Sequence, residues 1–292
     1  MRIGGLEAGG TKMVCAIGDE QGNITEKKII PTGTPQDTMP ELIDFYKGKG
    51  IEALGIGCFG PVDLNRKSST YGFIRQTAKL PWINFDMAGT MSKELQVPIG
   101  FDTDVNGAVL GEAVWGAAKG LDNAIYITVG TGIGVGVYID KRLVHGLMHP
   151  EAGHVLLSRH PKDTYKGRCP YHSNCAEGLA AGPAVEERWG QKAVELADRE
   201  EVWEMEAYYI SQAIADYIFV YSPEKIILGG GIMHQKKLYD MVRKQTKELL
   251  NGYIAKEEIL EDMENYIVEP LLGDEAGIKG ALYLGVLKLG NC

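Results

Sequence analysis

The sequence lacks a long hydrophobic run and an excess of positive charge. Its longest uncharged stretch, Ala124–Ile139, is shorter than the about 20 residues that a helix needs to cross a bilayer. The 39 acidic residues outnumber the 30 basic ones and give a net charge of -9, so no large positive field is available to hold a nucleic acid or an anionic membrane. The opening, MRIGGLEAGG, has neither the basic nor the apolar region of a signal peptide. We therefore expect a cytoplasmic protein that binds neither nucleic acid nor membrane.

Cysteine is also scarce. The five cysteines are too few for a disulfide scaffold, and two of them lie in the segment Cys169-Pro-Tyr-His172-Ser-Asn-Cys175. Two thiols and an imidazole at this spacing can bind Zn²⁺, and His154 can complete a tetrahedral structural site. His160 is an alternative fourth ligand, and a loop whose Cys and His side chains merely pack is the simplest alternative. A closed site of this kind would brace the loop rather than do chemistry.

Two common nucleotide-binding motifs are missing. The P-loop pattern GxxxxGK[ST] does not occur, and the GxGxxG match at Gly55–Gly60 is followed by Pro61 rather than by a helix, so a dinucleotide-binding turn is not expected. The composition, 45% hydrophobic and 24% charged, is that of a globular protein,. With 292 residues, two domains are more plausible than one,.

What the sequence does contain is a pair of similar glycine-rich hairpins. Residues 3–17 and 125–139 each consist of an apolar strand, a glycine and threonine turn, and a second strand,. Either one alone is equally well explained as a structural turn, but together they suggest a duplicated architecture. Backbone N–H groups at such bare turns can approach a phosphate closely. The candidate phosphate contacts are Gly9, Gly10, Thr11, Lys12, Thr131 and Gly132.

Strands and helices alternate along the chain, which predicts an α/β fold. Further strands are expected at 53–58, 98–102 and 225–228, and helices at 105–119, 183–197, 203–221, 235–251 and 274–288. Residues 145–177 lack helical periodicity and form a long loop. Small residues in the last helix, including Gly277, Gly280 and Gly285, permit close packing.

Seven motifs occur in the order seen in the ROK family of sugar kinases, which the chain resembles over essentially its whole length. They are EAGGTK at residues 7–12, DTDVN at 102–106, TVGTGIGVG at 128–136, EAGH at 151–154, the Cys/His loop, Glu177-Gly178, and LGGGI at 228–232. Within the family the chain is most similar to bacterial fructokinases, on the features Cys58–Pro61, Tyr71–Ile74, Thr77 with Lys79, Trp82 and Pro150.

The resemblance implies an actin-like, hexokinase-like ATPase fold with two lobes and a cleft between them. Residues 1–118, completed by a C-terminal helix at 274–292, are expected to form the small lobe, and residues 119–273 the large lobe. The chain would cross between lobes near 116–120 and 273–277, so closure around the substrates is expected. The resemblance also implies ATP with Mg²⁺, a structural Zn²⁺ and a homodimer.

For the site, the resemblance points to Asp104 as the general base. Asp104 follows a strand and opens a helix, and its simplest alternative role is a helix cap; Asp102 is a neighbour that can be mistaken for it. The implied sugar contacts are Gly60, Pro61, Thr103, Asp104, Glu151 and Glu177, and the implied adenosine contacts are Gly182, Pro183, Gly229, Gly230 and Gly231. Glu7 stands where relatives often carry Asp, which leaves its role as a Mg²⁺ anchor open.

The expected activity is phosphorylation of the 6-hydroxyl of D-fructose. Glucokinase, mannokinase and N-acetylhexosamine kinase activities are alternatives, because pocket shape decides among hexoses. A non-catalytic sugar sensor is a further alternative, since some members of the family are repressors with a DNA-binding module ahead of the kinase-like part. Here the first phosphate loop begins within ten residues of Met1, and the net charge is negative.

Overall fold

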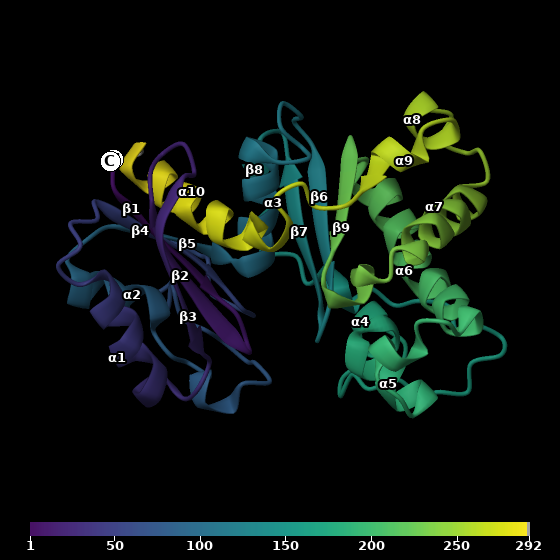
Figure 1. Ribbon diagram of the computed structural model, residues 1–292, viewed down its shortest axis with the longest axis horizontal. Helices are drawn as coiled ribbons and strands as arrows, with labels where there is room; N and C mark the ends of the chain where they lie inside the picture. Colours follow the sequence, from purple (N-terminus) through teal and green to yellow (C-terminus); the bar gives the residue numbers. More distant parts are fainter. Residues whose placement is uncertain (291–292) are drawn as a thin grey trace.

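The structure, a computed structural model, describes residues 1–290 and contains two five-stranded sheets (Figure 1). The first sheet has the order β3-β2-β1-β4-β5. In it, β1 pairs antiparallel with β2 and parallel with β4, and β4 pairs parallel with β5. The strands are β1 (Ile3–Ala8), β2 (Lys12–Gly18), β3 (Ile24–Pro31), β4 (Ala53–Cys58) and β5 (Ile99–Thr103).

The second sheet repeats this arrangement, in the order β10-β9-β6-β7-β8. Here β6 pairs antiparallel with β7 and parallel with β9. The strands are β6 (Ala124–Val129), β7 (Ile133–Ile139), β8 (Arg142–Leu143), β9 (Lys225–Gly229) and β10 (Ile267–Val268). The two predicted glycine-rich hairpins are therefore confirmed as β1–β2 and β6–β7, each at the same place in its sheet.

Two helices, α3 (Asp104–Trp115) and α10 (Ala276–Gly290), lie between the sheets (Figure 1). α10 packs on β1, β4 and β5, and α3 packs on α10 and on β6 and β7. Because α3 is covered on several sides, every residue from Asn106 to Ala113 is buried,. The predicted role of small residues holds: a Cβ on Gly280 would lie 1.6 Å from the carbonyl oxygen of Gly107.

The remaining helices cover the outer faces of the sheets (Figure 1). α1 and α2 share a hydrophobic core with the first sheet, and α6 and α7 share one with the second. These helices are α1 (Pro35–Tyr46), α2 (Met87–Leu95), α4 (Ala176–Ala180), α5 (Gly182–Trp189), α6 (Glu200–Tyr221), α7 (Lys237–Leu250), α8 (Glu257–Leu260) and α9 (Met263–Tyr266). In residues 1–290 none of the helices combines the length and the apolarity that crossing a membrane requires.

Several element boundaries differ from the prediction. The prediction of a helix at 183–197 is wrong for the second half of that range. α5 ends there at its C-cap, Gly190, which adopts a positive φ of 70°,. α1 and α2 were not predicted. α3 ends at Trp115 rather than at residue 119. Of the last segment predicted, 274–292, residues Asn291 and Cys292 lie outside the described residues. The long loop is confirmed, with only the short 3-10 turn η2 (Ala152–His154) before α4.

Candidate active site

Asp104 is the first residue of α3. The N-cap is its neighbour Thr103, whose hydroxyl oxygen accepts a hydrogen bond from the Asn106 N–H at 3.1 Å. Asp104 is therefore not the helix cap, and one of its oxygens accepts from the Val105 N–H at 2.9 Å. Burial raises the pKa of Asp104, and that hydrogen bond opposes the rise,. The Thr103 side chain is 4% exposed, and capping leaves only its hydroxyl proton for a ligand.

Asp102 has different partners. One of its oxygens accepts from the Thr103 N–H at 2.8 Å and from the Asn106 amide at 2.7 Å. The other lies 2.8 Å from Nε2 of His145. With both oxygens engaged by the protein, Asp102 is a structural anchor, which leaves Asp104 as the carboxylate free to take a proton.

Asp104 belongs to a group of carboxylates in which it acts on Glu7 and Glu151, and Glu177 acts on Glu151. Burial and the charge of Asp104 raise the pKa of Glu7 to about 7. Partial burial, together with the charges of Glu177 and Asp104, raises the pKa of Glu151 to about 7. Such coupling requires the four carboxyl groups to lie near one another. Glu7 lies on β1, Glu151 in the long loop and Glu177 on α4. Together with Asp104 they are suited to attract a cation or to accept hydrogen bonds from the hydroxyl groups of a polyol.

The first hairpin ends in a bare turn. The Gly9 N–H donates to the Lys12 carbonyl at 3.1 Å, and a Cβ on Gly9 would lie 2.7 Å from that oxygen, so only glycine fits there. At Gly10 the nearest group is Lys79, whose Cε lies 3.5 Å from the position of a Cβ. Thr11 and Lys12 are exposed. The Gly9 N–H is thus used within the turn, which lies beside the side chains of Lys12 and Lys79.

The second hairpin lies directly against the start of α3. A Cβ on Gly136 would lie 2.0 Å from the Val105 carbonyl oxygen, and one on Gly134 would lie 2.6 Å from the Val105 side chain. The hairpin tip is held by Glu177, which accepts from the Ile133 N–H at 3.1 Å and leaves no room for a side chain at Gly132. Thr131, at the tip, is exposed. Close packing of bare backbone therefore places this turn next to Asp104.

The residues predicted for the nucleotide end come together around the same hairpin. The Gly182 N–H donates to the Gly130 carbonyl at 2.7 Å, so the N-terminus of α5, with Pro183, adjoins the turn. The Gly231 nitrogen lies 3.9 Å from the position of a Cβ on Gly130. Gly230 has a φ of 97° and its Cβ would overlap the backbone of Val129. Gly229, at the end of β9, is buried.

Gly60 and Pro61, joined by a cis peptide bond, follow β4. Val62, the next residue, donates its N–H to Nε2 of His149 at 3.1 Å. Nδ1 of His149 lies 3.5 Å from a carboxylate oxygen of Glu151. The wall contributed by the first sheet is therefore in contact with the loop that carries Glu151.

The predicted metal ligands come together. The ligand atoms of His154, Cys169, His172 and Cys175 all lie within 4.8 Å of one another. Nδ1 of His154 is 3.9 Å from Sγ of Cys169 and 3.6 Å from Sγ of Cys175, and Nδ1 of His172 is 3.6 Å from Sγ of Cys169. A tetrahedron with Zn–S and Zn–N distances of about 2.3 and 2.0 Å has S···N edges of about 3.6 Å. The geometry fits zinc.

The alternative ligand His160 lies elsewhere. Its ring packs edge-on against Tyr208, 4.8 Å between centroids, and its Nδ1 accepts from the Lys162 N–H at 3.2 Å. That alternative was wrong, because the loop turns His160 toward α6 instead.

Cys175 caps α4, where its sulfur accepts from the Gly178 N–H at 3.3 Å. Burial raises the pKa of Cys175 to about 11, and the hydrogen bond from Gly178 opposes the rise,.

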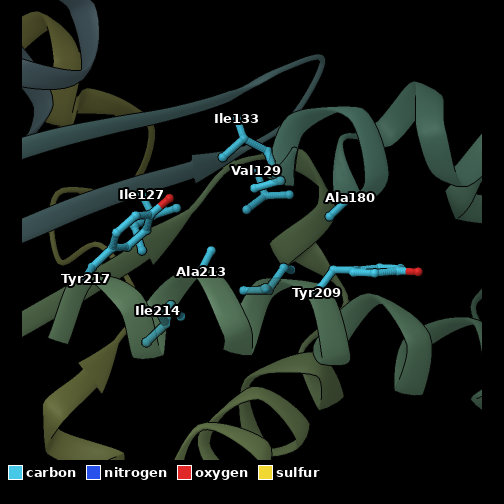
Figure 2. Close-up of a pocket in the computed structure, with 10 residues that line it drawn as sticks. Ile127, Val129, Ile133, Ala180, Tyr209, Ala213, Ile214 and Tyr217 are labelled. Carbon is cyan, nitrogen blue, oxygen red and sulfur yellow. The ribbon is translucent and has the colours of Figure 1, made fainter. Parts of the chain in front are cut away.

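A small apolar cavity lies under the second hairpin (Figure 2). Its volume is about 10 Å³, which is room for no more than one water. Figure 2 shows its lining, which comes from β6, β7, α4 and α6 and includes Val129, Ala180, Ala213 and Tyr217. The Tyr217 hydroxyl donates to the Ala152 carbonyl at 2.6 Å. The cavity is a packing defect, and Tyr217 ties the long loop to α6.

Comparison with known proteins agrees with this geometry. The ROK family model matches residues 3–286. The chain belongs to the ROK family. A putative fructokinase of Bacillus subtilis is 49% identical, with 97% of this chain and 94% of that protein covered. A fructokinase of Pediococcus pentosaceus is 42% identical, and the alignment covers 100% of this chain and 100% of that protein. The ROK hexokinase of Thermus thermophilus superposes with a TM-score of 0.82 at 26% identity, with both chains fully covered.

Membership of the ROK family confirms the predicted resemblance and fold class. Asn106, part of the DTDVN motif, donates to Asp102 and accepts from the Val137 N–H. Sequence reasoning missed His145 and His149, which contact Asp102 and the Val62 N–H. The available signal was the density of histidines, since five of the six lie between residues 145 and 172. The clustering of histidines was interpreted as a metal site alone, whereas His145 and His149 lie in the region of the candidate active site.

Proposed function

We propose that this ROK protein is an ATP-dependent fructokinase that transfers the γ-phosphoryl group to the 6-hydroxyl of D-fructose. The fructokinases among its relatives, similar over nearly the whole chain, support this choice. The observation that carries it is the position of Asp104, a carboxylate at the start of α3, packed beside the second glycine hairpin and within reach of the charges of Glu7 and Glu151.

In this mechanism Asp104 accepts the proton of the attacking hydroxyl as the O–P bond forms. A positioned base contributes about 10² to 10⁴ in rate. Burial raises the pKa of Asp104, which strengthens it as a base. Phosphoryl transfer otherwise depends on positioning and charge stabilisation, which the two bare turns would provide through their N–H groups.

The nucleotide would lie along the glycine turns. We assign its phosphates to Gly9, Gly10, Thr11, Lys12, Thr131 and Gly132, and its adenosine to Gly182, Pro183, Gly229, Gly230 and Gly231. Contacts among Gly130, Gly182 and Gly231 support a continuous surface at the adenosine end.

The sugar would lie between Asp104 and the long loop. We assign it to Gly60, Pro61, Thr103, Asp104, Glu151 and Glu177. Carboxylates with raised pKa values beside a polyol accept hydroxyl protons in hydrogen bonds, and the contact of His149 with both Val62 and Glu151 supports one pocket made from two segments.

Two metals fit this proposal. Mg²⁺ would arrive with ATP, and Glu7 is the carboxylate available to hold it, directly or through water; bound there, it would neutralise phosphate charge. Zn²⁺ would be held by His154, Cys169, His172 and Cys175, whose spacing fits a closed tetrahedral site,. Its role would be to brace the loop between Glu151 and Glu177.

We also propose that residues 1–118 with the C-terminal helix act as one lobe and residues 119–273 as the other, in a cytoplasmic homodimer. The two sheets, each with its own hydrophobic core, support the division into lobes. Light scattering after size exclusion tests the dimer.

The decisive experiment measures ADP release from MgATP with a panel of hexoses, for the wild type and for Asp104→Asn. Fructose should be the leading substrate, and the variant should lose about 10² to 10⁴ in kcat while keeping its affinity for ATP. Asp44→Asn, an exposed carboxylate on α1, is the matched control. Near-native turnover of Asp104→Asn would remove Asp104 as the base. A preference for glucose or mannose would reassign the substrate, and no stimulation by any sugar would favour a sensor.

A further inference from the structure

The segment 144–151, here called the strap, joins β8 to the turn that begins the metal loop. It contains no helix or strand. Its internal backbone bonds include one from the Gly146 N–H to the Met148 carbonyl, and the Leu147 side chain at its tip is fully exposed. The strap ends at Glu151, the proposed sugar ligand. Its own backbone bonds do not explain what holds Glu151 in place.

One histidine joins the strap to the strand that leads to the base. Nε2 of His145 lies 2.8 Å from a carboxylate oxygen of Asp102, whose side chain is 5% exposed. The other oxygen of Asp102 accepts from Thr103 and Asn106 at the start of α3. His145 therefore contacts the anchor that fixes the position of Asp104, two residues further on.

A second histidine joins the strap to the wall at Pro61. The His149 side chain is 4% exposed. Its Nε2 accepts from the Val62 N–H, and a Cβ on Gly60 would lie 3.4 Å from its ring. Because a backbone N–H can only donate, Nε2 carries no proton and Nδ1 does. Nδ1 then has two neighbouring acceptors, the Pro150 carbonyl at 3.4 Å and the carboxylate of Glu151 at 3.5 Å.

We propose that His145 and His149 are positioning residues for sugar binding, which hold Glu151 in register with Pro61 and Asp104. The inference rests on the proposed function, since it concerns the same sugar site. The two sides of the pocket come from segments far apart in sequence, and these two side chains connect them. Losing either contact would leave Glu151 on a strap free to move, which weakens sugar binding without touching the nucleotide turns.

The pKa values of the two histidines are shifted in opposite directions. The hydrogen bond to Asp102 raises the pKa of His145, while burial lowers the pKa of His149. The charged groups that act on His145 are Asp102 and Arg66, and those near His149 are Asp102, His145 and Glu151. The raised pKa of His145 agrees with its contact to the Asp102 carboxylate, and the lowered pKa of His149 agrees with its role as acceptor for the Val62 N–H.

The test compares KM for the sugar with KM for ATP in His145→Ala and His149→Ala. Loss of a hydrogen bond that involves a charged group should raise the sugar KM about tenfold or more, with the ATP KM changed less than about twofold. His145→Gln and His149→Gln are the conservative variants, because the Gln amide can donate to Asp102 or accept from Val62; both should recover most of the affinity. His160→Gln, outside the site, is the matched control.

A double-mutant cycle separates positioning from general loss of structure. If His145 acts through Asp102, then His145→Ala combined with Asp102→Asn should be no worse for the sugar KM than the worse single variant. Equal rises in both KM values, or additive effects, would overturn the inference. The comparison uses the hexose that the wild type phosphorylates best, so a substrate other than fructose would revise the proposed function and still test the histidines. A wild-type protein that phosphorylates no hexose would overturn both the proposed function and the inference about the two histidines.

Discussion

Asp102 and Asp104 are two residues apart in one motif, yet their surroundings give them different chemistry. Asp102 has both oxygens engaged, by backbone and side-chain donors and by His145. Asp104 has one backbone donor and neighbouring carboxylates that raise the cost of its charge in the absence of a cation. At the residue scale, function follows from which oxygens remain free.

The pH dependence of the unfolding free energy of a Glu7 variant tests this reasoning. Burial and Asp104 raise the pKa of Glu7 from 4.5 to about 7. A raised folded-state pKa means that this group favours folding below about pH 4.5, and that this contribution is lost as the pH rises through about 7,. Glu7→Gln should therefore gain roughly 1–3 kcal/mol in unfolding free energy over the wild type at pH 8, but little at pH 4.5, and should bind MgATP more weakly. Urea unfolding at both pH values measures the gain.

The control for this prediction is Glu94→Gln, an exposed position on α2. It should show no pH-dependent gain. A gain for Glu7→Gln that is the same at both pH values would mean that the carboxyl group carries no excess charge cost in the folded state.

At the scale of elements, the metal loop and α4 act as one unit. Cys175 caps α4, and Glu177, in the first turn of that helix, holds the tip of the second hairpin through the Ile133 N–H. His154 follows Glu151 by one short turn. A metal bound by the four ligands would therefore stabilise the flanks of the sugar site and, through Glu177, part of the phosphate turn.

Removal of the metal should consequently weaken sugar binding more than ATP binding. We expect a zinc-selective chelator, with Mg²⁺ kept in excess, to raise the sugar KM about tenfold while the ATP KM rises less. A tenfold rise in the sugar KM corresponds to a loss of about 1.4 kcal/mol in binding free energy. Steady-state kinetics before and after chelation measure both values, and added Zn²⁺ should restore them. Equal loss of both affinities would contradict the prediction.

At the scale of the whole molecule, two chain segments connect the sheets, one between α3 and β6 and one between β10 and α10. The carboxylate of Glu112, fully buried in α3, contacts both. It accepts from the Ala117 N–H at 2.6 Å in the first segment, and from the Leu271 and Leu272 N–H groups at 3.3 and 2.9 Å in the second. One side chain thus links both connections at the place where a hinge is expected.

Glu112→Gln tests the strength of this link. The amide nitrogen must face at least one backbone N–H group, so a hydrogen bond that involves a charge is lost and two donors are opposed. Unfolding free energy should fall by about 1.5–3 kcal/mol, measured by urea denaturation at pH 7. Glu94→Gln should change it by less than about 0.5 kcal/mol. A loss no larger than in this exposed control would show that Glu112 does not hold the segments together.

Prediction from sequence succeeded where the signal is local. The glycine turns at Gly9 and Gly130, the convergence of His154, Cys169, His172 and Cys175, and the helix beginning at Asp104 were all recognisable from residue type and spacing. Zinc binding itself stays a prediction. Prediction from sequence failed at α5, because the end of a helix depends on a left-handed residue such as Gly190 that hydrophobic periodicity does not register,. It also missed α1 and α2, and the contacts of His145 and His149.

The sequence by itself determined the two glycine-rich hairpins, the alternation of strands and helices, the family, and the residues available for chemistry, because turns, caps and ligand spacings act over a few positions. Only the tertiary structure decided which carboxylate stays free, which histidine turns away from the metal, and how Glu112 and the strap histidines connect distant segments. Those outcomes depend on contacts between residues tens or hundreds of positions apart. Burial and charge there follow from packing rather than from neighbours in the chain.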